Sequence, residues 1–431
     1  MLLASLPLVQ AQDTSRVRIK PYGFVRNYLN FDSRQMVTVC GGEYLMIPTD
    51  EDWNMTEADA SLYGADERFD SNAVPEMHLL ALSTRFGLAL DGGNLLGWKL
   101  SGRVEGDFAG FGNNNTVLRL RLAYVKLDYP LPTTHSQLVI GQDWHPLSGS
   151  IMPEALGMAA GAPFRPHSRT PQVRYTFYAH NGLGFTVAAL WQYQFTSPGP
   201  DGESAKYANR SLVPEAFLGL NYRAGSIYAQ LGVDYSNLLV RQELPVDDYY
   251  TGNTLYMHLL SDRCHSFSPT LYFQYTPGLF SVKLRSTLAQ NLAHLNMLSG
   301  YAWAADADGN MAYIPMQASV SYLDLSWGRR VRVNLFLGYQ HNFGLANKDY
   351  TIGVLSDDHL YMKKGVKNIR SIFRCAPSIS YNTKAFNIGL EYELTGVNYG
   401  RLDPSDGTVP ADAALHQVLG HRICALVKYN F

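Results

Sequence analysis

Residues 418–431 read VLGHRICALVKYNF, and this terminal stretch indicates how the chain folds. Every second residue, counted back from the end, belongs to an apolar row closed by aromatic side chains: Phe431, Tyr429, Val427, Ala425 and Ile423. The interleaved row is mostly polar: Asn430, Lys428, Leu426, Cys424 and Arg422. A β-strand repeats every two residues, so one face meets an apolar medium and the other meets water. Because aromatic side chains gather where a membrane meets water, the pattern favours a lipid-facing strand over a strand in a soluble core.

The composition agrees with a single membrane barrel. No Pro/Gly/Ser linker or change of composition divides the 431 residues, and mean hydropathy is near zero at -0.14. No apolar run approaches the length of a membrane-spanning helix, which excludes helical spans. The 28 Tyr, 19 Phe, 6 Trp and 37 Gly suit strands, tight turns and aromatic girdles. A net charge of -2 argues against a nucleic-acid partner, since such proteins usually carry a basic excess.

The N-terminal segment resembles the end of a secretory signal. Residues 2–9 are hydrophobic and lead into Gln10-Ala11-Gln12, so we expect residues 1–11 to be a residual signal peptide cleaved after Ala11. No Lys or Arg precedes the hydrophobic run, which favours a true start upstream of Met1. The four cysteines lack metal-ligand spacing, and we expect reduced thiols. A disulfide that pins Cys40 to Cys264 stays open as an alternative.

Residues 12–431 are predicted to form one all-β domain, a transmembrane antiparallel up-and-down barrel. Short turns rich in Gly, Asn, Asp or Pro are expected at 91–94, 130–136, 181–184, 224–226, 276–279, 328–330 and 382–384. Longer connections lie at 33–75, 110–116, 145–170, 196–212, 242–262, 294–313, 345–368 and 400–417. Their alternation predicts roughly sixteen strands, with short periplasmic turns and long extracellular loops.

The clearest two-residue alternation covers residues 95–108. There Trp98, Leu100, Val104 and Phe108 share one parity, while Lys99, Ser101, Arg103, Glu105 and Asp107 share the other. Apolar rows at 185–195 and 331–339 repeat the pattern. So many amphipathic strands exceed what a soluble sandwich needs. Two charged residues, Lys126 and Asp324, take the outward parity near turns.

The charges of inward parity are mostly basic. The predicted lumen cations are Arg26, Arg85, Lys99, Arg103, Arg119, Arg121, Arg174, Lys283, Arg285, Arg332, Arg370 and Arg374. The acids of the same parity are Glu105, Asp107, Asp143, Asp234, Glu391 and Glu393. Charge inside a low-dielectric wall concentrates the opposite ion, so this lumen should favour anions. Arg119/Arg121 and Arg370/Arg374 should form ladders along the wall. Alternatively, these arginines only pair with lumen acids and brace the barrel.

The connection 145–170 is more apolar than an exposed loop should be. It contains Ile151-Met152-Pro153-Glu154 and the run from Gly157 to Gly161. One hypothesis is an inward-folded constriction loop, with Glu154, Arg165 and Arg169 near the narrowest point. The alternative is a loop packed on a neighbouring subunit or on the outer rim.

The sequence gives little support to a metal or catalytic site. Twelve histidines are spread through the chain without an i, i+4 pair backed by carboxylates. We therefore expect His145, His167 and His180 to be solvated or to line the pore, with no metal and no cofactor. Ser266 follows His265 directly, which is adjacency rather than a catalytic arrangement.

Three stretches, taken in order, resemble the DcaP-like porins of Gram-negative bacteria. They are residues 21–26 with 32–34, residues 118–125 with 139–144, and residues 169–175. The resemblance implies a trimeric diffusion porin whose basic constriction passes small anionic solutes such as dicarboxylates. By position, the lumen residues it carries over are Arg26, Arg119, Arg121 and Arg174. The helical N-terminal extension of the family prototype has no counterpart in this sequence, so trimer contacts would rest on the barrel wall.

The expected function is therefore a passive, anion-preferring porin in the outer membrane of a Gram-negative bacterium, not an enzyme. Expected partners are membrane lipid, lipopolysaccharide, small anionic solutes, two further copies of the chain, and the barrel assembly machinery, which would read Phe431. Three alternatives stay open: a barrel enzyme acting on lipid or peptide, a closed structural or adhesive barrel, and a substrate-specific uptake channel with an aromatic track inside the pore.

Overall fold

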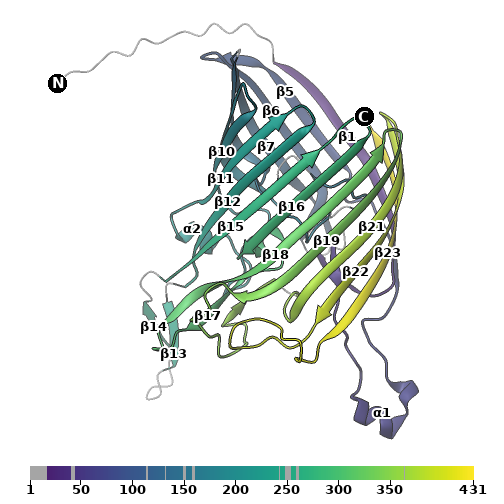
Figure 1. The fold of residues 1–431 in the computed structure, drawn as a ribbon, viewed down its shortest axis with the longest axis vertical. Coiled ribbons are helices and arrows are strands. Elements are labelled where there is room, and N and C mark those ends of the chain that lie inside the picture. The colour runs from purple at the N-terminus through teal and green to yellow at the C-terminus, as the bar shows by residue number, and fades with distance from the viewer. Residues whose placement is uncertain are drawn as a thin grey trace, which may run out of the picture.

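The computed structural model describes residues 17–431 except 40–43, 113–114, 132, 149–151, 158–160, 242, 248–253, 259–261 and 364. Within them, one antiparallel sheet closes on itself as a barrel of sixteen strands (Figure 1). This confirms the predicted fold class. The proposed signal segment, residues 1–11, and Cys40 lie outside the described residues, while the Cys264 thiol is buried.

The barrel strands follow one another around the wall in chain order. They are β1 (Arg18–Asp32), β4 (Glu76–Leu80) with β5 (Arg85–Leu95), β6 (Trp98–Gly112), β7 (Asn115–Pro130), β8 (Thr134–Trp144), β9 (Arg169–Ala179), β10 (Leu183–Leu190), β11 (Glu215–Ala224), β12 (Ile227–Leu239), β15 (Arg263–Tyr275), β16 (Phe280–Gln290), β18 (Met311–Gly328), β19 (Val331–Leu345), β21 (Ile369–Asn382), β22 (Phe386–Tyr399) and β23 (His416–Asn430). Strands β4 and β5 both pair with β1 and together form one interrupted strand.

The two ends of the described chain close the barrel. Strand β1 pairs with β23 along Phe24–Asp32 and with β5 along Arg18–Phe24. The terminal Phe431 exchanges two backbone hydrogen bonds with Gly23, of 3.1 and 3.2 Å. A side chain at Gly23 would meet the Phe431 ring at 2.6 Å, so glycine is what allows this aromatic residue to cover the seam.

The outer and inner surfaces follow the two-residue period. On β23, Val427 and Tyr429 are exposed, whereas Cys424 and Leu426 are buried in the barrel interior. The exposed rows are apolar on most strands, which is the surface a barrel presents to lipid. No helix among the described residues is long and apolar enough to cross a membrane.

Most short turns fall where they were predicted, but the first one is displaced. Residues 91–94 lie inside β5, and the chain turns at Leu96-Gly97 instead. Gly92 and Gly93 have positive φ angles of 131° and 94°, and the register with β6 shifts there. The two glycines therefore produce a bulge in the strand rather than its end.

The remaining elements are short and lie in the long connections. They are β2 (Met36–Val39), β3 (Tyr44–Pro48), α1 (Glu57–Tyr63), η1 (Ala65–Glu67), α2 (Lys206–Arg210), β13 (Glu243–Asp247), β14 (Thr254–His258), η2 (Ala293–Leu295), β17 (Tyr301–Ala305) and β20 (Leu360–Tyr361). Helix α1 and the β13–β14 hairpin extend from the end of the barrel opposite the C-terminus (Figure 1). A large apolar cluster that includes Phe164, Phe336 and Leu360 fills the space between these connections and the strands.

Candidate functional site

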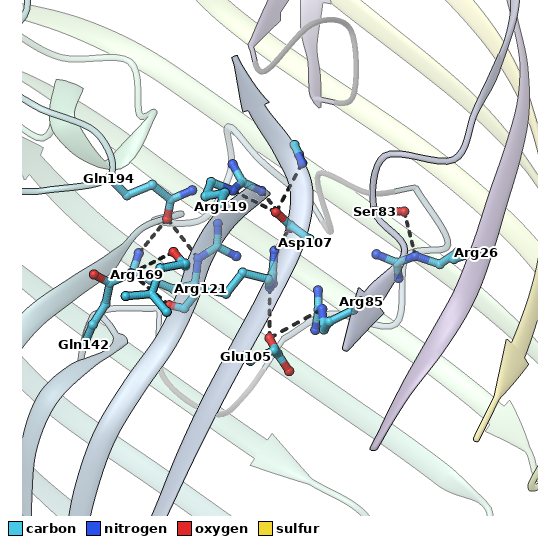
Figure 2. Close-up of polar contacts among 12 residues, drawn as sticks. Arg26, Ser83, Arg85, Glu105, Asp107, Arg119, Arg121, Gln142, Arg169 and Gln194 are labelled. Atoms are coloured by element: carbon cyan, nitrogen blue, oxygen red, sulfur yellow. Dashed lines mark hydrogen bonds and ion pairs between the residues drawn. The ribbon is translucent and has the colours of Figure 1, made fainter. Parts of the chain in front are cut away.

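A ladder of ion pairs occupies the inner face of β6 and β7. The Asp107 carboxylate accepts two hydrogen bonds from Arg119, of 2.8 and 2.9 Å, and one of 2.5 Å from Arg121. Arg121 also donates to Glu105 at 2.9 Å. Arg121 lies at a bulge, where the partners of Glu105 and Gly106 are Leu122 and Leu120. The extra residue lets both arginines reach Asp107, as Figure 2 shows.

The ladder continues onto the neighbouring strands and stays basic. Arg85 of β5 lies 3.4 Å from Glu105, and Arg26 of β1 donates to Ser83 at 3.0 Å (Figure 2). Arg103 is exposed, its guanidinium lies 5.7 Å from the centre of the Tyr22 ring, and it forms no ion pair with a carboxylate of the described residues.

We call this surface the basic wall. It carries five guanidinium groups against two carboxylates: Arg26, Arg85, Arg103, Arg119 and Arg121 against Glu105 and Asp107. Because the guanidinium groups outnumber the carboxylates, the basic wall has a net positive charge even though most of its arginines have partners.

Strand β9 places its two arginines differently. Arg174 is half-buried and bound to Asp143 at 2.6 Å and to the Trp144 carbonyl at 3.1 Å. Arg169 is buried, donates to Gln194 at 2.9 Å and lies over the Trp144 ring. Arg174 therefore faces the lumen, whereas Arg169 supports the base of the connection between β8 and β9.

A pocket of about 560 Å³ opens beside Arg174, toward the turn end of the barrel. It includes Arg223, an exposed residue of β11 that lies over the rings of Tyr178 and Tyr228. The prediction from sequence omitted Arg223. Its parity matches that of Asn221, which is buried in the interior, so counting the two-residue period up to the turn would have found it.

The connection after β8 crosses to the other side of the barrel. The Glu154 carboxylate accepts hydrogen bonds from Lys283 of β16 at 2.9 Å and from Arg332 of β19 at 2.7 Å. The Glu154 backbone N–H donates to Asp324 of β18 at 3.1 Å. Burial alone would raise the pKa of Glu154, but the two cations hold this pKa below its ordinary value.

Leu156, Gly157 and Ala162 continue these contacts. The backbone N–H groups of Leu156 and Gly157 donate to Glu391 of β22 at 2.8 and 3.0 Å. Arg374 of β21 donates to the Ala162 carbonyl at 2.7 Å and to Thr395 at 2.8 Å, and it lies 3.2 Å from Glu393. We call the wall formed by β16, β18, β19, β21 and β22 the loop-covered wall.

Other predicted site residues lie away from open space. Arg285 is buried and lies over the Tyr272 ring, and Arg165 is buried against Trp144. Arg165 also donates to His167 at 2.8 Å. Arg370 is the extra residue at a bulge of β21, because Ile369 pairs with Tyr399 and Ser371 with Asn398. The bulge interrupts the expected ladder from Arg370 to Arg374.

Three assignments made from sequence are wrong. Asp324 is buried and faces the interior, in the same two-residue row as the buried Val320 and Tyr322. Lys126 pairs with lumen-facing Ser101 and contacts Asp128, since the bulge at Arg121 reverses the parity beyond it. His145 and His167 are buried rather than solvated or exposed to the pore. Burial, followed by Arg165 and Arg169, keeps the pKa of His167 well below its ordinary value.

The adjacent Ser266 and His265 point to opposite faces of β15. Ser266 is buried in the interior beside Cys264, whereas His265 is exposed and stacks on Tyr235. The two side chains therefore do not face each other as a nucleophile and its base would.

Apolar-out, polar-in strands that close into a barrel of sixteen define the class of outer-membrane barrels. Comparison with solved structures finds the same fold in known outer-membrane channels. The outer membrane channel DcaP of Acinetobacter baumannii matches with a TM-score of 0.61 and 16% identity, over 96% of this chain and 97% of that chain.

An anion-selective porin from Comamonas acidovorans matches with a TM-score of 0.49 and 11% identity, over 96% of this chain and 100% of that one. No protein-family model and no curated protein matches the sequence. The resemblance to DcaP-like porins thus extends to the whole fold. The predicted location, the outer membrane of a Gram-negative bacterium, is the one that this fold implies.

Proposed function

We propose that this protein is an outer-membrane porin, a passive channel for small hydrophilic solutes that prefers anions. The observation that carries the proposal is the basic wall, with its five guanidinium groups against two carboxylates. The structural similarity to porins supports a channel, and the excess of positive charge supports the preference.

The two walls differ in charge, which would steer ions across the lumen. On the loop-covered wall, the charges balance, because four cationic side chains face four carboxyl groups: Lys283, Arg285, Arg332 and Arg374 against Glu154, Asp324, Glu391 and Glu393. An anion would therefore follow the basic wall, where the surrounding low dielectric strengthens attraction. Residues 152–157 and 161–164 would set the size limit, because they occupy space in front of the loop-covered wall.

Small dicarboxylates are the solute class that the resemblance to DcaP-like porins implies. Arg103 on the basic wall and Arg223 in the pocket beside Arg174 are both exposed. A guanidinium that presents its edge to water can bind a carboxylate through two parallel hydrogen bonds. Two such groups along the lumen would give a dianion successive binding positions without holding it tightly.

The proposal also covers the oligomeric state of the protein and its insertion into the membrane. A homotrimer in contact with lipid and lipopolysaccharide is what the resemblance implies, and the apolar outer rows offer a surface for both. Phe431, exposed at the seam beside Gly23, would be the residue that the barrel assembly machinery reads.

The test is the reversal potential and single-channel conductance of the purified protein in a planar bilayer under a KCl gradient. We expect a stable conductance with anion preference. Arg103→Glu should lower the anion-to-cation permeability ratio several-fold, because an exposed positive group becomes negative without breaking an ion pair. Lys384→Glu, the same change in charge in the exposed turn between β21 and β22, is the matched control. A cation preference would overturn the basic-wall argument, and no conductance would overturn the channel itself.

A further inference from the structure

Four buried side chains from separate parts of the chain meet where the connection after β8 begins. They are His145, Glu215 at the start of β11, Asp234 of β12, and His294 in η2. His145 Nε2 lies 2.8 Å from Glu215 Oε1 and 3.9 Å from Asp234 Oδ1, and His294 Nε2 lies 3.1 Å from Glu215. All four side chains are almost completely inaccessible to solvent.

Hydrogen bonding within the cluster is unequal. Glu215 faces both imidazoles, whereas in the described part of the chain the Asp234 carboxyl receives no hydrogen bond from an N–H or hydroxyl group and lies against Glu215. No Lys or Arg of the described residues forms an ion pair with either acid. Two buried carboxylates near each other repel, and burying an uncompensated charge costs several kcal/mol. The cluster therefore brings together two imidazoles and two buried carboxyl groups, one of them without an N–H or hydroxyl donor, and this set of ligand atoms points to a missing cation.

We propose that this cluster binds one divalent transition-metal ion, with Zn²⁺ as the best match. Two imidazoles and two carboxylates are a donor set that Zn²⁺ accepts in tetrahedral geometry. With neutral imidazoles, the two carboxylate charges balance a dication, so the complete site is neutral. The candidate ligand atoms of His145, Glu215 and His294 already lie within 4.8 Å of one another.

Binding requires a defined exchange of protons. The bond from the Leu147 N–H to His145 Nδ1, at 3.2 Å, places the proton of neutral His145 on Nε2, where it is donated to Glu215. For the metal to bind at Nε2, the single proton of each neutral imidazole moves to Nδ1, so both rings stay neutral, and at His145 the weak bond from Leu147 is given up. Affinity for the metal therefore falls as the pH is lowered, because protons compete for the imidazole nitrogens.

The position of the cluster suggests how a metal ion could enter and which segments a bound ion would connect. Glu215 lines a pocket of about 340 Å³ that also includes Asn209 and the exposed Leu212, so the cluster can be approached from outside the barrel. A bound ion would connect the beginning of the loop at His145 to β11, β12 and η2. It would thereby fix the loop at the end opposite to its Glu154 contacts.

The first measurement is the metal content of untagged protein purified from outer membranes, by inductively coupled plasma mass spectrometry. One equivalent of metal per chain is expected, removable by a chelator and restored by Zn²⁺ with one-site behaviour in calorimetry. Wild-type protein without this equivalent, and without Zn²⁺ binding after chelator treatment, would overturn the proposal and identify the cluster as a hydrogen-bonded network.

Variants decide whether the ion lies at this cluster. Asp234→Asn keeps the side-chain shape and removes one ligand charge, and His294→Gln removes one imidazole. Each variant should lose the bound equivalent or bind Zn²⁺ roughly tenfold more weakly or worse. Removing a group that only hydrogen-bonds to a metal ligand already has an effect of this size, and removing a ligand itself should cost at least as much. His180→Gln, at an exposed turn, is the control and should bind as wild type does. If Asp234→Asn and His294→Gln both bind Zn²⁺ normally, the metal lies elsewhere and the proposal fails.

Discussion

The basic wall and the loop-covered wall contain similar residues but use them in different ways. On the basic wall, neighbouring strands supply both partners of each ion pair, as in Arg119 with Asp107. On the loop-covered wall, Glu154 comes from a distant loop to contact Lys283 and Arg332. The first arrangement holds the strands together and leaves a surplus of positive charge. The second arrangement neutralises the wall and uses its cations to hold the loop.

The ion pairs of the two walls also differ in how much stability is lost when one partner is removed. Pairs such as Asp107 with Arg121 are nearly inaccessible to water, whereas Glu154 and Arg332 keep about a third of their side-chain surface exposed. Breaking a buried pair leaves a charge without compensation, while breaking an exposed pair is largely offset by water. The basic wall should therefore be the more sensitive to the loss of one partner, and the loop should be the more easily moved.

The largest effect should come from Asp107→Asn. The change preserves shape but leaves Arg119 and Arg121 with one carboxylate fewer, at a cost of about 3 to 5 kcal/mol in the free energy of unfolding. Urea unfolding in detergent micelles would measure it. Asp128→Asn is the matched control, because Asp128 is partly exposed, pairs with Lys126 and should cost about 1 kcal/mol or less. Equal losses from the two variants would contradict the contrast between buried and exposed pairs.

An intermediate effect is expected from Gly338→Ala on the loop-covered wall. A methyl group at Gly338 would lie 2.4 Å from a ring atom of Phe164, which is buried against Phe336. The ring must move, at a cost of about 1 to 3 kcal/mol, and part of the loop should be released. Urea unfolding and single-channel conductance would measure the loss of stability and the expected rise in conductance.

A second substitution tests whether the clash is the cause. Phe164→Leu removes ring atoms, so the Gly338→Ala/Phe164→Leu double variant should be less destabilised than the sum of the single variants. Strict additivity would show that the glycine acts through the backbone of β19 and not through the loop.

The features that depend on local periodicity could be predicted from the sequence. The barrel, its sixteen strands and the inward position of Arg119 and Arg121 follow from alternation, because side chains of a strand change face at every residue. Bulges are where this rule fails. Lys126 was assigned to the wrong face, since the extra residue Arg121 reverses every side chain of β7 beyond it.

Contacts between distant segments could not be predicted. Leu156 and Glu391 are separated by 235 residues, and the bond between them depends on the path of the loop through the interior. The cluster around Glu215 has the same origin, because His145 and His294 belong to connections that meet only in the closed barrel. Spacing along the chain therefore gave no sign of it, although the residue types are those of a metal site.

The smallest effect should come from Glu154→Gln, which weakens the contacts of the loop with Lys283 and Arg332. Because the pair is partly exposed, the cost to stability should be below about 1 kcal/mol, yet conductance should rise as the loop moves. The folded-state pKa of Glu154 is depressed, so its contribution is complete above the ordinary Glu pKa and is lost as the pH falls through the lower folded value.

Conductance measured from neutral to acidic pH separates this mechanism from general titration of the lumen. Wild-type conductance should stay level down to about pH 4.3, the ordinary pKa of Glu, and rise below it as the loop is released. Glu154→Gln should begin higher and lack that transition, whereas Glu51→Gln, an exposed acid outside the lumen, should behave as wild type does. If Glu154→Gln kept the full acid transition, lumen acids such as Glu105 would account for it. The loop-covered wall would then play no part in setting the conductance.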